Sequence, residues 1–285
     1  MEIKKIGVLG AGTMGAGIAQ VCAQSGYQVI LVDIEQAIID KALKTINKAW
    51  GKAVEKGKLT EDAVQKMQSL ITTGTDPKDF ADCNIVIEAI VENMEIKKKV
   101  FAQLGEICRP EAILATNTSA LSITEIAVAS KRAAQVVGMH FFNPVPVMKL
   151  VEIIPGVETS QETVDIVTDL SIKIGKEPVP AQETPGFIVN RLLLPYINEA
   201  AHLLQEGVPA EQIDKAMMLG ANMPMGPLAL ADLVGLDVCL NICEYFWKEF
   251  GDSKYRPALI LRNKVRAGHL GRKTGKGIYD YTKSL

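Results

Sequence analysis

The hydrophobic positions in the first part of the chain form short, continuous apolar runs, separated by stretches with helical spacing. Continuous runs, rather than alternating apolar and polar positions, are typical of strands covered on both faces of a parallel sheet. The runs lie at 6–9, 28–32, 85–89, 113–116, 136–139, 150–154 and 178–180. Helical spacing over 13–25 follows the first run, and helical spacing over 161–173 separates the last two. This order predicts an α/β fold with a Rossmann-type, doubly wound, mostly parallel sheet.

The pattern changes near residues 183–186, where the sequence reads Glu-Thr-Pro-Gly. Beyond this point the apolar spacing is helical, and Pro and Gly separate the helices. The predicted helices are 187–206, 210–219, 236–250 and 257–267. We therefore expect two domains: residues 1–184 contain the sheet, and residues 185–285 form an all-α C-terminal domain.

The composition narrows the classes of function. Lys and Arg total 31 and Asp and Glu total 33, so the net charge of -2 lacks the basic excess typical of nucleic-acid-binding proteins. No apolar stretch is long enough for a membrane helix, and the N-terminus has no signal-peptide pattern. The five cysteines are scattered and histidines number only three, which favours reduced, buried thiols over a metal site. We expect a cytoplasmic protein with no nucleic-acid, membrane or metal partner.

A glycine-rich turn follows the first predicted strand. Gly10, Gly12 and Gly15 match G-x-G-x-x-G, between a strand and a helix. In that context the glycines permit a tight turn and close approach to a pyrophosphate, which the helix N-terminus faces. Asp33 ends the second strand, where a carboxylate accepts from the ribose hydroxyls and repels a 2′-phosphate. This predicts NAD rather than NADP; the alternatives are a flavin or nucleotide-sugar site, or a loop without a ligand.

A stripe of lysines marks one face of the helix expected after the second strand. Apolar residues between 39 and 53 fall on the opposite side, and few acidic residues compensate the stripe. Like charges at this spacing are mildly unfavourable. The stripe therefore indicates either a solvated helix face or a site for phosphates such as those of coenzyme A. Its members are Lys41, Lys44, Lys48, Lys52 and Lys56.

His140 is the most informative single residue. It follows a predicted strand, at the carboxyl edge where sites of α/β proteins lie. A core histidine with satisfied hydrogen bonds is the competing interpretation. Glu152 favours catalysis, because a carboxylate within an apolar strand requires a partner. Bonded to an imidazole N–H, it orients the ring and makes the other nitrogen a better base.

Two neutral polar residues complete the candidate site. Ser119 follows the strand at 113–116, and Asn190 lies in the first predicted helix of the second domain. Ser119 lacks the G-x-S-x-G context of a hydrolase nucleophile. We interpret both side chains as hydrogen-bond donors to a substrate oxygen. The alternative for Ser119 is a helix cap.

With these motifs the chain resembles the 3-hydroxyacyl-CoA dehydrogenases, most closely the short-chain bacterial 3-hydroxybutyryl-CoA dehydrogenases. The resemblance extends over nearly the whole chain. The segments His-Phe-Phe-Asn-Pro at 140–144 and Thr-Pro-Gly-Phe at 184–187 are its most specific parts. The other matching segments are 10–15, 88–93, 117–119 and 271–277.

The resemblance implies a role for each matched residue. His140 is the general base, Glu152 its partner, and Ser119 and Asn190 hydrogen-bond the reacting oxygen. The reaction is NAD-dependent oxidation of an (S)-3-hydroxyacyl-CoA at C3, or its reverse. Lys52 acts with Lys56 as an acyl-CoA contact. The implied NAD contacts are Gly10, Gly12, Gly15, Asp33, Glu92, Lys97, Asn143 and Lys273.

Two alternative functions compete with this interpretation. One is another β-hydroxyacid dehydrogenase of the 6-phosphogluconate type, although those enzymes use a catalytic lysine where this chain has His140. The other is a catalytically silent, crystallin-like or NAD-binding structural protein. We also expect a homodimer formed by C-terminal helices, from apolar residues at 192–197 and 236–242. The range of acyl chain lengths, the physiological direction and any assembly above a dimer stay open.

Overall fold

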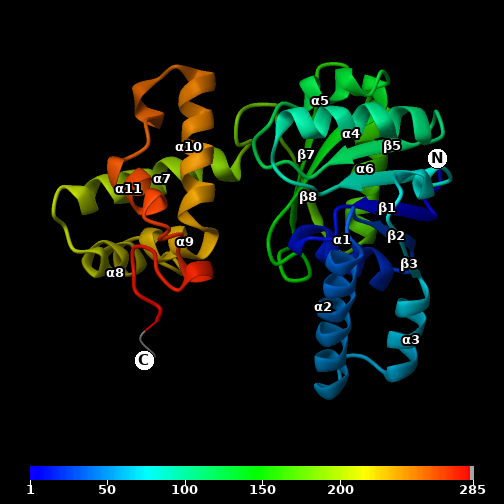
Figure 1. Ribbon diagram of the computed structural model, residues 1–285, viewed down its shortest axis with the longest axis horizontal. Coiled ribbons are helices and arrows are strands. Elements are labelled where there is room, and N and C mark those ends of the chain that lie inside the picture. The colour runs from blue at the N-terminus through cyan, green and yellow to red at the C-terminus, as the bar shows by residue number, and fades with distance from the viewer. Residues whose placement is uncertain (283–285) are drawn as a thin grey trace. The chain divides into compact units, whose positions relative to one another are not determined.

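An eight-stranded sheet forms the centre of the first of two units, Met1–Thr184, in this computed structural model (Figure 1). The structure describes residues 1–282, and the second unit begins at Pro185. The strand order is β3-β2-β1-β4-β5-β6-β7-β8. All neighbours are parallel except β6 and β7. The doubly wound, mostly parallel sheet predicted from the apolar runs is confirmed. The strands are β1 (Lys5–Leu9), β2 (Gln28–Val32), β3 (Ile71–Gly74), β4 (Ile85–Glu88), β5 (Ile113–Thr116), β6 (Val136–Phe141), β7 (Leu150–Pro155) and β8 (Glu177–Pro180).

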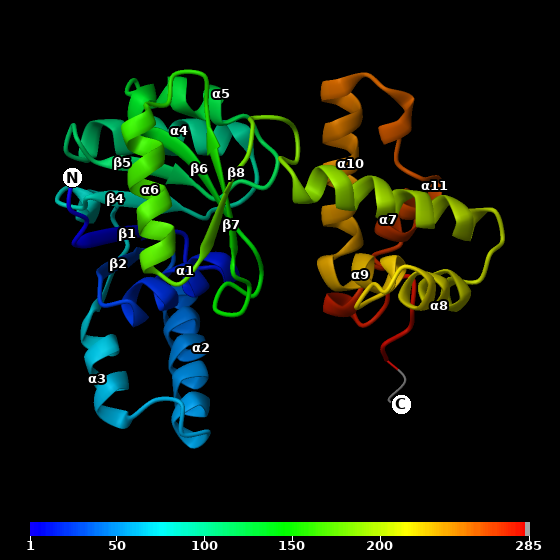
Figure 2. The same cartoon turned by 180° about the vertical axis from the view of Figure 1, so that it is seen from behind.

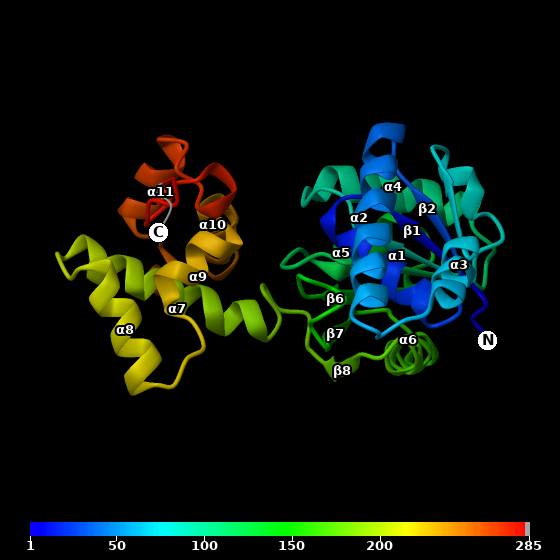
Figure 3. The same ribbon diagram turned by 90° about the horizontal axis from the view of Figure 1, so that it is seen from below.

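Helices cover both faces of this sheet. The helices α1 (Thr13–Gln24) and α6 (Gln161–Lys173) contribute to one hydrophobic core with alternate residues of the central strands. The helices α4 (Met94–Ile107) and α5 (Ile123–Ala129) pack together on the face opposite α6 (Figures 2 and 3). Because both faces are covered, the central strands are mostly apolar, which explains their continuous hydrophobic runs.

The segment between β2 and β3 forms two helices, α2 (Gln36–Glu55) and α3 (Glu61–Ser69), which extend side by side away from the sheet (Figures 1 and 2). Ile39, Ile46 and Trp50 of α2 are buried, whereas the lysines of its other face are exposed. Strand β3 was not predicted, because its sequence Ile-Thr-Thr-Gly at the sheet edge lacks an apolar run.

The second unit is helical in the part that the structure describes, apart from isolated bridges near its end. Helix α9 was not predicted, because the Pro and Gly residues before it indicated only a break. Its first residue is Pro227, a position where proline's missing N–H costs nothing. Figure 3 shows α8 beside α7 and α9. The helices are α7 (Val189–Gln205), α8 (Ala210–Gly220), α9 (Pro227–Val234), α10 (Leu236–Phe250) and α11 (Leu259–Arg266).

The apolar residues expected to form a dimer contact are divided between core and surface. Leu194 and Ile197 of α7, like Leu236 of α10, are 2% exposed or less. Leu192 is 71% exposed and Val238 is 39% exposed. Many of the apolar side chains that we expected to contact a second copy of the chain are therefore already buried within the chain.

Candidate functional site

The glycine turn between β1 and α1 leaves space above the first turn of the helix. Gly10 adopts a positive φ of 98°, and a Cβ on Gly15 would lie 1.7 Å from the Gly10 carbonyl oxygen. Within residues 1–282, no atom beyond Gly12 itself and its two chain neighbours lies within 4 Å of the position of a Gly12 Cβ, and no side chain caps α1. Backbone N–H groups at an open helix N-terminus bind phosphate. The turn therefore fits the pyrophosphate of a dinucleotide.

Asp33 lies beside this turn, immediately after β2. Its Oδ2 accepts a hydrogen bond from the Ala11 N–H at 2.7 Å, while Oδ1 accepts one from the Glu35 N–H at 3.4 Å. The Asp33 side chain is half-buried. Its hydrogen bond to the Ala11 N–H joins the glycine turn to the end of β2. A carboxylate in this place suits the ribose hydroxyls of NAD.

His140 and Glu152 face each other across the only antiparallel strand pair in the described sheet. They occupy directly opposite positions in the register of β6 and β7. The His140 Nδ1 lies 2.7 Å from the Glu152 Oε2, and the two residues are 6% and 0% exposed. The imidazole ring also contacts the Phe142 ring, with centroids 4.4 Å apart. A buried carboxylate on Nδ1 orients the ring so that Nε2 can exchange a proton with a substrate.

The loop between β5 and α5, which contains Ser119, is held by Glu92. The Glu92 Oε1 accepts from the Thr118 Oγ1 at 2.7 Å, the Ser119 N–H at 2.8 Å and the Ser119 Oγ at 3.0 Å. Asn117 connects the loop to β6, because its Oδ1 accepts from the Phe141 N–H at 2.8 Å. Ser119 and His140 therefore belong to adjacent strand ends, at the carboxyl edge of β5 and β6.

Glu88, which the sequence analysis did not single out, forms a buried ion pair behind this loop. The Lys97 Nζ lies 2.6 Å from the Glu88 Oε1 and 3.4 Å from the Glu92 Oε2. Glu88 also accepts from the Thr116 Oγ1 at 2.7 Å and from the Ile90 N–H at 2.7 Å. Lys97, which the resemblance assigned to NAD, is 1% exposed. Its ammonium group links the two carboxylates and so supports the carboxylate that holds Ser119.

A hollow of about 530 Å³ lies between α1, α2 and the segment after His140. Asn143 lines it together with Gly12 and Lys41. A second buried lysine, Lys176, holds the segment in place by donating to the carbonyl oxygens of Val145 and Met148. Burial lowers the pKa of Lys176 below its ordinary value. The hollow thus adjoins the glycine turn on one side and the lysine stripe of α2 on the other.

Two predicted site residues belong to the second unit. Asn190 lies in the first turn of α7. Lys273 lies in the short 3₁₀ helix Arg272–Thr274, where its ammonium group pairs with the Asp237 carboxylate at 2.6 Å. The structure describes these residues within their own unit, and Ser119, His140 and Glu152 within the first.

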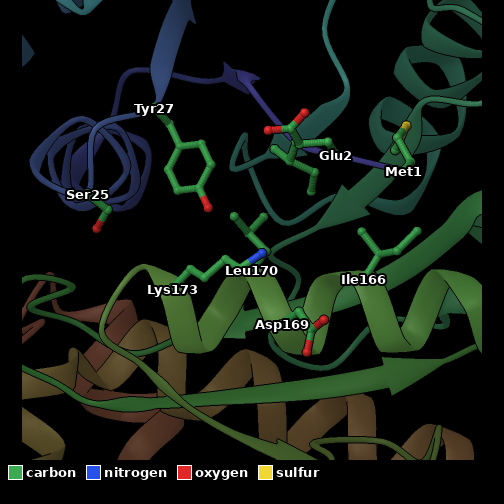
Figure 4. A pocket seen from close by; sticks show the side chains of 9 residues that line it. Met1, Glu2, Ser25, Tyr27, Ile166, Asp169, Leu170 and Lys173 are labelled. Atoms are coloured by element: carbon green, nitrogen blue, oxygen red, sulfur yellow. The ribbon is translucent and has the colours of Figure 1, made fainter.

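Other polar features offer less chemistry. A polar hollow of about 350 Å³ near Tyr27 and Lys173 lies at the amino ends of β1 and β2, opposite the glycine turn (Figure 4).

Within residues 1–282, no three His, Cys, Asp or Glu side chains gather where they could hold a metal ion. None of the helices in those residues combines the length and apolarity that a bilayer crossing demands. Burial raises the pKa of the Cys22 thiol to about 12, so it is unsuited to nucleophilic catalysis.

Glu88 and Lys176 are the positioning residues that the sequence analysis missed. A signal for Glu88 was present, because a glutamate ends an apolar strand there just as Glu152 interrupts one. Lys176 lay in a polar turn with no such signal. Its role depends on the fold of a loop far away in sequence.

Family models match almost the whole chain. Residues 5–184 match the NAD binding domain of 3-hydroxyacyl-CoA dehydrogenase, and residues 186–281 match its C-terminal domain. A probable 3-hydroxybutyryl-CoA dehydrogenase of Deinococcus radiodurans is 54% identical over 278 residues, covering 97% of this chain and 100% of the relative. A 3-hydroxybutyryl-CoA dehydrogenase of Clostridioides difficile is 52% identical, covering 98% and 100%. The crystal structure of (S)-3-hydroxybutyryl-CoA dehydrogenase from Ralstonia eutropha aligns with a TM-score of 0.95 and 47% identity, covering 99% and 100%.

Proposed function

The chain belongs to the 3-hydroxyacyl-CoA dehydrogenase family, an NAD-dependent oxidoreductase family, and from that premise we propose that it interconverts (S)-3-hydroxybutyryl-CoA and acetoacetyl-CoA. The observation that carries the proposal is the buried His140–Glu152 pair, with its 2.7 Å contact at the carboxyl edge of the sheet. The names of relatives at about half identity support a four-carbon acyl group.

His140 acts as the general acid–base group. In the direction of oxidation, its Nε2 accepts the proton of the 3-hydroxyl group. NAD, held at the glycine turn, would supply the acceptor for the hydride that leaves C3. In the reverse direction the imidazolium ring donates that proton to the ketone oxygen. Glu152 hydrogen-bonds Nδ1 and stabilises the imidazolium form. A positioned acid–base group of this kind contributes roughly 10²–10⁴ to the rate.

Ser119 and Asn190 donate hydrogen bonds to the substrate oxygen. Donors of this kind stabilise the negative charge that develops on an oxygen in the transition state. Glu92 supports this role for Ser119, because it accepts from the Ser119 N–H and so restricts the loop. The Ser119 hydroxyl, which also donates to Glu92 in this structure, has a single hydrogen and must turn from Glu92 to donate to the substrate oxygen. Asn190 completes the donor set from the first turn of α7.

The NAD-binding residues are those of the glycine turn and Asp33, with Glu92, Asn143 and Lys273 as further contacts. The open backbone at Gly12 suits the pyrophosphate, and the Asp33 carboxylate suits the adenosine ribose. Lys97 contributes through Glu92, because its own ammonium group is buried against Glu88.

The acyl-CoA extends from the reacting carbon along the hollow beside α2. Lys41 lines that hollow, and Lys52 and Lys56 follow on the same side of α2 and at its end, where they suit the phosphates of coenzyme A. Replacing Lys52 or Lys56 by Ala should raise the KM for acetoacetyl-CoA about 2- to 5-fold, since exposed charge pairs are weak. The matched control is Lys66→Ala on α3, which should leave this KM unchanged. Acetoacetyl-pantetheine lacks the nucleotide phosphates, so its KM should not respond to any of these changes.

Steady-state assays test the reaction itself. Purified protein should oxidise NADH in the presence of acetoacetyl-CoA, with kcat/KM highest for the four-carbon substrate and negligible for free acetoacetate. Turnover of the free acid would instead favour a general β-hydroxyacid dehydrogenase. Tight NADH binding without turnover of any acyl-CoA would favour a silent structural protein.

We also propose that the protein is a homodimer joined through its helical unit. Exposed apolar side chains of that unit support this, notably Leu192, Leu219 and Leu259, which are 61–76% exposed. Light scattering at micromolar concentration should report twice the chain mass, whereas a monomeric mass would refute the proposal. Replacing Leu192 or Leu219 by Lys should shift the mass toward the monomer.

A further inference from the structure

Gln20, in the second half of α1, is a buried carboxamide to which the structure gives no hydrogen-bond partner within residues 1–282. The residue is only 7% exposed. Asn198, the other carboxamide among the buried polar residues, has both ends paired: it donates to the Arg256 carbonyl oxygen at 3.0 Å and accepts from the Ala258 N–H at 2.9 Å. Buried polar groups nearly always have a partner. Gln20 therefore requires an explanation that Asn198 does not.

Gln20 lines the hollow of about 530 Å³ between α1, α2 and the segment after His140. Thr13, Ala16 and Gly17 line it too, and steps of three or four residues place them on the same face of α1. Among the described residues that line the hollow, Gln20 is the one buried polar side chain. The rest of the lining is mostly small or aliphatic, and it includes Ala16, Gly17, Ala42, Ile46, Val145 and Pro146. The hollow thus offers a single carboxamide in apolar surroundings.

The segment after His140 forms a firm wall of this hollow. A Cβ on Gly17 would lie 2.8 Å from the Val145 Cβ, so the segment approaches α1 more closely than a side chain at position 17 would permit. The buried Lys176 ammonium group donates to the Val145 carbonyl oxygen and so holds the segment in that place. Val145 itself is buried. The hollow is therefore a preformed feature of the first unit, as small-molecule sites usually are.

The chemistry of the hollow selects a neutral ligand that contains an amide. A carboxamide carries no charge, so Gln20 does not offset the charge of a phosphate. Its N–H groups donate and its oxygen accepts, which matches the groups of another amide. The apolar walls suit methylene and methyl groups, whereas Lys41, at the edge of the hollow, begins the lysine face that suits phosphates. The pantetheine arm of coenzyme A has this composition, because two amide groups alternate with short aliphatic segments between the thioester and the phosphates.

We propose that the hollow holds the pantetheine arm of the acyl-CoA, and that the Gln20 carboxamide hydrogen-bonds one amide group of that arm. This inference rests on the proposed function, because it requires an acyl-CoA substrate. All the residues that form this site belong to the first unit. Gln20 contacts a group that takes no part in the reaction, so it contributes to substrate binding rather than to the chemical step.

Replacing Gln20 by Met removes the carboxamide and keeps a side chain of similar length. A hydrogen bond between neutral groups contributes modestly, so the KM for acetoacetyl-CoA should rise about 2- to 12-fold while kcat stays within about twofold. Acetoacetyl-pantetheine has both amides and no nucleotide, so its KM should rise by the same factor. S-ethyl acetoacetothioate has neither amide, so its KM should not respond. Lys52→Ala should show a different pattern, because it affects only the complete coenzyme A thioester.

The matched control is Gln24→Met. Gln24 is the last residue of α1, one turn beyond Gln20, and its side chain is exposed. Its replacement should leave the KM values of all three thioesters unchanged. If Gln20→Met and Gln24→Met raised all three KM values equally, the effect would lie in the helix rather than in a ligand contact, and the proposal would be overturned.

NADH binding separates the pantetheine arm from the cofactor, because the glycine turn also borders the hollow. The Kd for NADH, from fluorescence titration, should stay within about twofold in Gln20→Met. A raised Kd together with an unchanged KM for acetoacetyl-pantetheine would assign the hollow to the dinucleotide. That result would also overturn the proposal.

A second variant tests the hollow from α2. If Gln20→Met does not fold, Ala49→Leu narrows the hollow without altering α1, and Ala49 is exposed, so the larger side chain does not disturb the core. This variant should raise the KM for acetoacetyl-pantetheine and leave that for S-ethyl acetoacetothioate unchanged; equal KM values in variant and wild type would contradict the proposal. Lack of wild-type turnover of acetoacetyl-CoA would refute the proposed function, whereas normal wild-type turnover with an unchanged KM in Gln20→Met would refute this inference alone.

Discussion

Replacing Glu152 by Gln removes the negative charge from the His140 pair and keeps its shape. The contact between Nδ1 and Oε2 is 2.7 Å, and the two side chains are 7% and 0% exposed, so solvent screens it little. A hydrogen bond to a charged group contributes about 1.5–3 kcal/mol. That contribution is made to the imidazolium form, which develops as the hydroxyl proton is transferred. At about 1.36 kcal/mol per tenfold, Glu152→Gln should lower kcat for oxidation roughly 10- to 150-fold.

His140→Ala should cost more, about 10²–10⁴ in kcat, because it removes the proton acceptor itself. The double variant should be little worse than His140→Ala, since Glu152 acts through the ring. The assay is steady-state formation of NADH from 3-hydroxybutyryl-CoA, with NADH affinity and melting temperature measured on each variant. Glu177→Gln on the neighbouring strand β8 is the control, because Glu177 pairs with Lys149 at 3.3 Å in an exposed ion pair.

A different set of results would show His140 to be a core residue. In that case His140→Ala would lower the melting temperature and weaken NADH binding, while kcat per folded molecule stayed at the wild-type value. Glu152→Gln would follow the same pattern. Either outcome would refute the general-base assignment.

Three further predictions concern the cofactor, the buried ion pair and the thiols. Asp33→Ser combined with Ile34→Arg should shift preference from NADH toward NADPH; better use of NADPH by the wild type would contradict the role of Asp33. Glu88→Gln leaves the Lys97 ammonium group with one carboxylate, and breaking a buried pair costs about 3–5 kcal/mol. At roughly 2–4 °C per kcal/mol, its melting temperature should fall by about 6–20 °C, and a fall below about 3 °C would argue against this account. Burial raises the pKa values of all five cysteines to about 11 or 12, so the thiolate fraction at pH 8 is very small. Iodoacetamide should therefore label these cysteines only after the protein is unfolded. Mass spectrometry of the folded and unfolded protein measures the labelling.

Local patterns in the chain predicted most of the secondary structure and the chemistry of single residues. The helix expected over 161–173 is α6 at Gln161–Lys173, because its spacing and flanking residues are local signals. The glycine turn and Asp33 were recognised for the same reason. The order of strands and helices then determined the fold class, because a parallel sheet requires covered, apolar strands.

The partners of polar residues depended on tertiary structure. The sequence indicated that Glu152, a carboxylate in an apolar strand, requires a partner. Its position opposite His140 follows from the antiparallel register of β6 and β7. Glu88 could not be paired with Lys97 from the sequence, because the pair forms only when α4 packs back over the end of β4. Glu183 likewise accepts from the Ser122 Oγ only because the end of the first unit returns past the start of α5.

The sequence by itself therefore determined which elements form, which turn suits a dinucleotide and which residues could carry out acid–base chemistry. Only the tertiary structure decided which carboxylate holds which cation or loop, and which apolar residues of α7 and α10 are buried, such as Leu194, or exposed, such as Leu192. The physical reason is the distance along the chain over which each interaction acts. Hydrophobic periodicity and turn chemistry act over a few neighbouring residues, whereas hydrogen-bond pairing and burial depend on register and packing between segments far apart in the chain.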